Sequence, residues 1–244
     1  MAASLTVLLG AFAALLGATL QSAAGFGFAL IAAPLLVAAL GPRPAVSAII
    51  VLALIVSALT LAGEHRRPRP NTREAVALVG WSLPGLLAGA LLLGVAPERA
   101  LKVLVAVVVM VAVGLRLLGA PRRLPWSHPR AAATGLTSGA LSTSTGIGGP
   151  PLVFHLLGRG LTNVQMRDTL AVVWLAGGIL SAGALVVTGA FVLPDEAPYL
   201  ALATVVGYLV GRRLFRFLHE GRYERVVLGA LAATAVISLI AAVA

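Results

Sequence analysis

In the segment ALSTSTGIGGPPLVFHLL, residues 140–157, glycines and prolines at 146–151 interrupt an otherwise apolar run. Glycine adopts positive φ freely and proline lacks an amide donor, so this segment should break a helix. The apolar pieces on either side, 131–145 and 150–158, are too short for a comfortable membrane crossing, which takes about 20 helical residues. We predict two half-helices joined by a break.

Composition identifies lipid as the solvent of most of this chain. Of its 244 residues, 59% are hydrophobic and 11% are charged, and the mean hydropathy is +1.02. A soluble domain has roughly 45–50% apolar and about 25% charged residues. Apolar segments recur near 4–24, 28–40, 44–62, 75–95, 99–118, 131–145, 150–158, 168–190, 197–215 and 223–243. They lack the period of two that a membrane β-strand requires, so we predict an all-α polytopic membrane protein.

The two halves of the chain carry matching landmarks. Gly25-x-Gly27 precedes Gly146-x-Gly148 by 121 positions, and Gly85-x-x-x-Gly89 precedes Gly207-x-x-x-Gly211 by 122. Two landmarks at nearly one offset predict an internal duplication of about 120 residues. We assign 1–119 to a first membrane repeat, 120–130 to a cytoplasmic linker and 131–244 to a second membrane repeat. Segment 4–24 lacks the basic n-region of a secretory signal, so we keep it in the mature protein.

The charges of the connections predict the orientation. Connections 63–74, 116–130 and 212–225 carry four, four and five arginines, whereas 191–198 carries Asp195 and Glu196 and no base. By the positive-inside rule the first three are cytoplasmic and the last is external. Corresponding helices of the two halves then run in opposite directions. We predict two inverted repeats, each a glycine-broken helical hairpin plus three transmembrane helices.

Several function classes are excluded or disfavoured. The formal net charge is +10, but the arginines lie in short connections rather than along one face, so we expect no nucleic-acid partner. The chain has no cysteine and therefore no disulfide or thiolate metal site. It has no P-loop, HExxH or G-x-S-x-G motif. We expect no enzyme, no catalytic residue, no bound metal and no cofactor.

The two glycine breaks are the candidate binding site. In transporters built from inverted repeats, discontinuous helices hold the substrate near the bilayer midplane. Helix N-termini at a break carry partial positive charge, which suits an anion. The substrate-binding candidates around the breaks are Gln21, Ser22, Gly25, Phe26, Gly27, Gly146, Gly148 and Gly149. The alternative is that the glycines only allow close helix packing, which we favour for Gly85/Gly89 and Gly207/Gly211.

Four consecutive hydroxyls precede the second break: Ser142, Thr143, Ser144 and Thr145. Hydroxyls can replace part of the hydration shell of an anion without adding charge, so all four are further substrate-binding candidates. The alternative is hydrogen bonding to carbonyls of the preceding helical turn.

Three ionisable residues are candidates for coupling or gating. His155 lies about one turn past Pro151 and could titrate, or could be an ordinary hydrogen-bonded histidine. Arg167 could attract an anion or anchor the helix at the interface. Asp168 is predicted as the N-cap of the helix that follows. A proton or a sodium ion could serve as the coupling ion.

The glycine segments resemble those of a known family. Gly25-Phe26-Gly27-Phe28 with Pro34-Leu35-Leu36, and Gly146 to Val153, are similar to the paired glycine-rich signatures of the TauE/SafE sulfite exporter family of membrane permeases. The resemblance spans nearly the whole chain. It implies a secondary transporter of sulfite, of sulfonates such as sulfoacetate, or of related organic and sulfur-containing anions, in the bacterial cytoplasmic (inner) membrane.

We therefore expect alternating-access transport of a small anion, with the two broken helices as its binding site and the lipid bilayer as its surroundings. Two alternatives remain at this point: a gated channel for a small solute, and a membrane assembly subunit that transports nothing. The direction of transport and the oligomeric state stay open.

Overall fold

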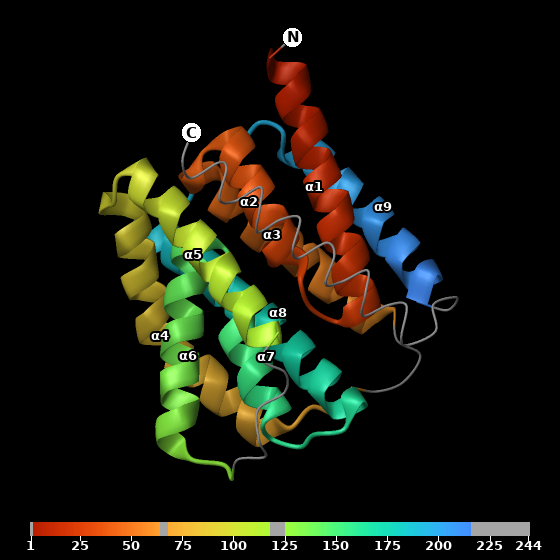
Figure 1. The fold of residues 1–244 in the computed structure, drawn as a ribbon, viewed down its shortest axis with the longest axis vertical. Coiled ribbons are helices and arrows are strands. Elements are labelled where there is room, and N and C mark those ends of the chain that lie inside the picture. Colours follow the sequence, from red (N-terminus) through yellow and green to blue (C-terminus); the bar gives the residue numbers. More distant parts are fainter. Residues whose placement is uncertain (1, 64–67, 118–124, 216–244) are drawn as a thin grey trace.

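The computed structural model describes residues 2–63, 68–117 and 125–215, and every regular element in these ranges is an α-helix (Figure 1). The expected all-α class is confirmed. The helices are α1 (Ala2–Ala24), α2 (Phe28–Leu40), α3 (Pro42–Ala62), α4 (Thr72–Val95), α5 (Glu98–Leu117), α6 (His128–Thr145), α7 (Gly149–Leu157), α8 (Asn163–Val187) and α9 (Ala197–Phe215). The predicted segment 223–243 lies outside the described residues.

Local sequence explains where these helices begin and end. Proline stands in the first turn of α3, α6 and α7, where its missing amide costs nothing. Asn71 caps α4 by accepting from the Glu74 amide at 3.2 Å, and Thr162 caps α8 by accepting from the Gln165 amide at 3.2 Å. The prediction of Asp168 as the cap of α8 is therefore wrong. The polar residues after Thr162 already extend the helix, so it starts well before the apolar segment does.

Two helix pairs are held together by glycines. A β-carbon on Gly85 or Gly89 of α4 would overlap backbone oxygens of α6, those of Leu136 and Ala140. On α9, Gly207 and Gly211 meet the backbone of α1 in the same way. The predicted packing role of these glycines is confirmed, because backbones can approach this closely only where side chains are absent.

Hydrogen bonds across the same two interfaces join side chains of one helix to the backbone of the other. Thr143 of α6 donates to the Leu86 carbonyl of α4 at 2.8 Å. Thr19 of α1 donates to the Gly207 carbonyl of α9 at 3.1 Å. Each pair joins a helix from one half of the chain to a helix from the other.

Helices α3 and α8 lie between these pairs. Helix α3 is the most buried of the long apolar helices, and Gly178 of α8 lets the Leu54 side chain of α3 approach closely. Helices α2 and α7 are the short helices that directly follow the two glycine breaks. The largest apolar core joins α1, α2, α3, α5 and α9, and a separate cluster joins α4, α7 and α8.

Helices α4, α6 and α8 begin at one end of the molecule, which we name the arginine-rich end after Arg69, Arg73, Arg130 and Arg167 at or beside their starts (Figure 1). The Arg69 amide donates to Asp168 at 2.7 Å, and Arg212 donates to the Gly63 carbonyl at 3.1 Å. At the other end Arg43 donates to the carbonyls of Leu93 and Gly94, which close α4.

Three described helices are long and apolar enough to cross a membrane, by length and composition: Pro42–Ala62, Thr72–Val95 and Val164–Val187. Large apolar side chains are exposed along their outer faces, for example Leu87, Leu91 and Ile179. Lipid can accommodate such a surface.

Candidate functional site

Both glycine motifs interrupt the helices as predicted. Gly25 and Gly27 have φ of 80° and 106°, and Gly146 has φ of 77°, all in the region that disfavours L side chains. Helix α2 starts again at Phe28 and α7 at Gly149, so each break presents a helix N-terminus.

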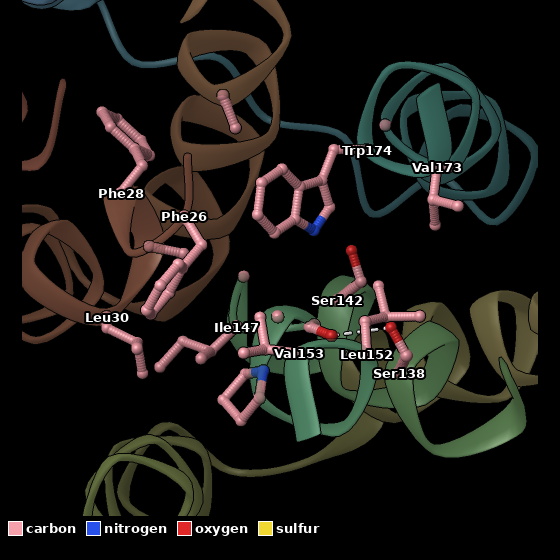
Figure 2. Close-up of a pocket in the computed structure, with 18 of the residues that line it drawn as sticks. Phe26, Phe28, Leu30, Ser138, Ser142, Ile147, Leu152, Val153, Val173 and Trp174 are labelled. Atoms are coloured by element: carbon pink, nitrogen blue, oxygen red, sulfur yellow. Dashed lines mark hydrogen bonds between the residues drawn. The ribbon is translucent and has the colours of Figure 1, made fainter. Parts of the chain in front are cut away.

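The two breaks line one cavity of about 140 Å³. Its wall is mostly apolar and includes residues 26–30 of the first break and 146–150 of the second. Figure 2 shows Phe26 and Ile147 reaching it from the two breaks, with Trp174 of α8 opposite. The predicted convergence of the two breaks is confirmed. The described residues that line the cavity include no charged side chain.

The polar groups of the cavity wall are neutral hydrogen-bonding side chains. They are Gln21, Ser82, Ser138, Ser142, Ser181 and Trp174. Ser138 donates to the Gly148 carbonyl at 2.7 Å and so holds the second break against α6. Ser142 and Ser181 lie 3.2 Å apart, and Ser181 donates to the Gly177 carbonyl. Since the Ser181 hydrogen is donated there, Ser142 is the donor in its bond to the Ser181 oxygen. A ligand that offers a better acceptor can take over this hydrogen of Ser142.

The two helix N-termini offer unequal numbers of amides. The first-turn amides of a helix have no partner inside it, and in α2 these belong to Phe28, Ala29 and Leu30, which line the cavity. In α7 the corresponding positions include Pro150 and Pro151, which have no amide hydrogen. The first break is therefore the richer source of backbone donors, and the serines of α6 and α8 supply donors on the other side.

The four hydroxyls before the second break have different surroundings. Ser142 lines the cavity, whereas Thr143 bonds to α4. Ser144 and Thr145 donate to the carbonyls of Ala140 and Leu141 one turn back, and the Thr145 oxygen also accepts from the Ile147 amide at 3.1 Å. Only Ser142 of this run belongs to the cavity wall; the other three support the helix and the break.

The first-half candidates also divide. Gln21, Phe26 and Gly27 line the cavity, and the Gln21 amide nitrogen lies 3.4 Å from the Ser57 hydroxyl of α3. Ser22 faces away from it, donating to the Thr19 carbonyl and packing against Gly211. Gly25 packs against the aliphatic part of Arg167.

Of the second-half glycines, Gly146, Gly148 and Gly149 all belong to the cavity wall. A β-carbon on Gly146 would lie 3.0 Å from the Ile49 side chain of α3, so this glycine also allows a close approach between helices.

His155 lies outside the cavity in a buried polar cluster that we name the Glu74 cluster: Glu74, Thr134, His155 and Arg159. Glu74 is 1% exposed; one carboxylate oxygen accepts from Arg159 Nε and the other lies 3.0 Å from His155 Nε2. Thr134 Oγ1 lies 3.2 Å from His155 Nδ1. The cluster joins α4, α6 and α7.

The other two coupling candidates lie at the start of α8. Arg167 lies against the first break through Gly25. Asp168 is 3% exposed and accepts from the Arg69 amide, and its neighbour Thr169 accepts from the Asn71 amide at 2.9 Å. These two bonds fasten α8 to the segment that leads into α4.

Sequence reasoning misses several of these residues. Ser138 precedes Ser142 by one helical turn, a spacing that places both on one face and is a usable signal. Glu74 falls in an exposed arginine-rich connection by sequence, and nothing there pairs it with Arg159, 85 positions away. Trp174 and Ser181 are isolated on an apolar helix and give no signal.

The family model described as "Sulfite exporter TauE/SafE" matches residues 9–237, almost the entire chain. No curated protein and no solved structure matches.

Proposed function

Since the chain belongs to the sulfite exporter TauE/SafE family, a family of membrane transporters for sulfite or related anions, we propose that it is a secondary transporter whose substrate anion binds in the cavity between the two breaks. The substrate is sulfite, a sulfonate such as sulfoacetate, or a related organic or sulfur-containing anion.

The observation that carries this proposal is the convergence of both breaks on one cavity with neutral donors. Residues 28–30 of α2, whose amides have no partner within the helix, line the same cavity as the serines of α6 and α8, and a negative charge would gain from both kinds of donor. Because the described wall residues carry no fixed charge, an anion can also leave without breaking an ion pair. The apolar part of the wall suits a substrate with a carbon group, as a sulfonate has.

Alternating access between two inverted repeats is the mechanism that we propose for movement across the membrane. In support, α1 packs against α9, and α6 packs against α4, through equivalent glycines. Helix α1 of the first half corresponds to α6 of the second half, and α4 corresponds to α9. The pair of α1 and α9 is therefore the counterpart of the pair of α6 and α4, with the two halves exchanged. Such reciprocal packing is what a pseudo-two-fold axis in the membrane plane would produce. Rocking of the two halves would expose the cavity to either side in turn.

The proposed setting is the bacterial inner membrane, crossed several times. The arginine-rich end would face the cytoplasm, since α4 and α6 begin there and the sequence before each of them is rich in arginine. Arg167, against the first break, and Asp168, bonded to the segment before α4, are proposed to control access to the cavity from that end.

Counterflow into proteoliposomes tests this function. Vesicles preloaded with unlabelled anion are diluted into the same labelled anion, with sulfite, sulfoacetate and thiosulfate tried in turn. We expect transient accumulation of label for at least one anion, saturating as its concentration rises. A pore would only equilibrate the label, and a non-transporting subunit would give no uptake with any anion; either result would refute the proposal.

A further inference from the structure

The Glu74 cluster is a buried group of ionisable side chains that the binding cavity does not use. The exposed fractions of the Glu74, His155 and Arg159 side chains are 1%, 8% and 17%. Burying charged groups is costly, and in membrane helices such groups mark function more often than stability. We propose that His155 in this cluster binds the proton that accompanies the substrate anion. The coupling between proton binding and anion binding rests on the proposed function, whereas the proton site itself does not.

The hydrogen bonds of His155 allow it to gain a proton without losing a partner. Glu74, ionised beside Arg159, can only accept, so Nε2 of His155 carries a hydrogen and donates to it. In the neutral ring, Nδ1 accepts from the Thr134 hydroxyl. When Nδ1 takes up a proton, the same hydroxyl accepts instead, and its own hydrogen can turn to the carbonyl one turn back in α6.

Proton uptake changes the charge of the cluster from zero to +1. Glu74 and Arg159 cancel each other, and the neutral histidine adds nothing. Other charged groups in the packed elements lie against residues outside the cluster, as Arg167 of α8 does against Gly25. Arg73 lies 3.6 Å from the Trp126 ring centroid, where His128 also packs, and Arg130 donates to the Pro125 carbonyl. Asp168 of α8 accepts from the Arg69 amide.

Helix α7 connects this charge to the cavity. Leu152, Val153 and Phe154 of α7 line the cavity, whereas His155 faces Glu74. His155 is six positions after Gly149, which is about 9 Å along the helix axis. At about that distance, a positive charge tightens binding of a monovalent anion on the order of tenfold for an effective dielectric constant near 20. The protonated cluster thus supplies the balancing charge that the cavity wall lacks.

The proton site is tested first without any anion. The full chain is labelled with ¹⁵N-histidine in lipid nanodiscs, and its four histidines are followed by NMR from about pH 5 to about pH 8. We expect the resonance that disappears in His155→Gln to titrate at Nδ1 while Nε2 keeps its hydrogen. His128→Gln, the control, should keep this resonance. A His155 ring that stays unchanged over this range overturns the proposal.

Thr134→Val keeps His155, Glu74 and Arg159, so it remains informative if His155→Gln does not fold. Valine cannot accept from the protonated Nδ1, and we expect His155 to take up its proton at lower pH than in the wild type. An unchanged titration would overturn the assigned hydrogen-bond exchange.

Coupling is tested with ethanesulfonate, a monovalent anion that does not itself titrate in this range. We expect it to bind about tenfold more tightly at low than at high pH, and to raise the pH at which His155 is protonated, since linkage is reciprocal. In His155→Gln the affinity should not depend on pH. Ethanesulfonate that binds equally at both pH values overturns the coupling. If ethanesulfonate, sulfite and sulfoacetate all fail to bind, both the proposed function and the coupling are refuted. The proton site is then judged only by the titration of His155.

Discussion

At the scale of single residues, neighbours on α6 have opposite roles. Ser142 lines the cavity and its hydroxyl is able to turn toward a ligand, whereas Ser144, two positions later, is 2% exposed and donates to the Ala140 carbonyl. Two positions on a helix are about 200° apart, so the two side chains point to opposite faces.

A naturally cysteine-free chain allows this difference to be measured directly. We expect Ser142→Cys to react with a small maleimide and to be protected by a saturating concentration of the transported anion. Ser144→Cys, the matched control, should react slowly in both cases because its position is buried. Labelling of Ser142→Cys that the anion leaves unchanged would contradict a site at this position.

Gly146 shows how strictly the break depends on its backbone. It has φ of 77° and lies against Ile49, so Gly146→Ala should lower the free energy of unfolding by about 1–2 kcal/mol. Gly183 of α8 is helical and has open space where a β-carbon would lie, so Gly183→Ala should raise it by about 0.5–1 kcal/mol. Reversible unfolding in mixed micelles provides both values. Equal effects would mean that the break is not strained by a side chain.

At the scale of elements, the glycine interfaces join the two halves. Gly89 of α4 faces Ala140 and Thr143 of α6, whereas Gly94 on the same helix has open space beside it. Gly89→Ala should destabilise the protein by about 1–3 kcal/mol through overpacking, and Gly94→Ala should not. The same unfolding assay compares the two. A silent Gly89→Ala would show that α4 and α6 are not in close contact.

Most helix boundaries could be predicted from the sequence because glycine, proline and the apolar runs act locally. The start of α8 could not, since Asn163, Gln165 and Arg167 make residues 163–167 polar enough that hydropathy assigns them to a connection. Contacts between residues far apart in the sequence could not be predicted either. Glu74 and His155 are 81 positions apart, and only the packing of α4 against α6 and α7 brings them together.

At the scale of the whole molecule, charge asymmetry predicts the orientation in the membrane. Thr72, at the arginine-rich end, and Asp195, in the acidic connection, are both exposed. In intact cells, an impermeant maleimide should label Asp195→Cys and leave Thr72→Cys unlabelled until the cells are opened. The reverse pattern would invert the proposed topology and place the Glu74 cluster on the outer side.

The most direct test of the binding site is to locate the anion itself. The selenium analogue of the anion that gives the strongest counterflow would be bound to the full chain, and its selenium found by anomalous scattering. We expect a selenium peak in the cavity between the start of α2 and the start of α7, within hydrogen-bonding reach of Ser142. Selenium bound elsewhere on the protein, with this cavity empty, would contradict the transport site proposed here.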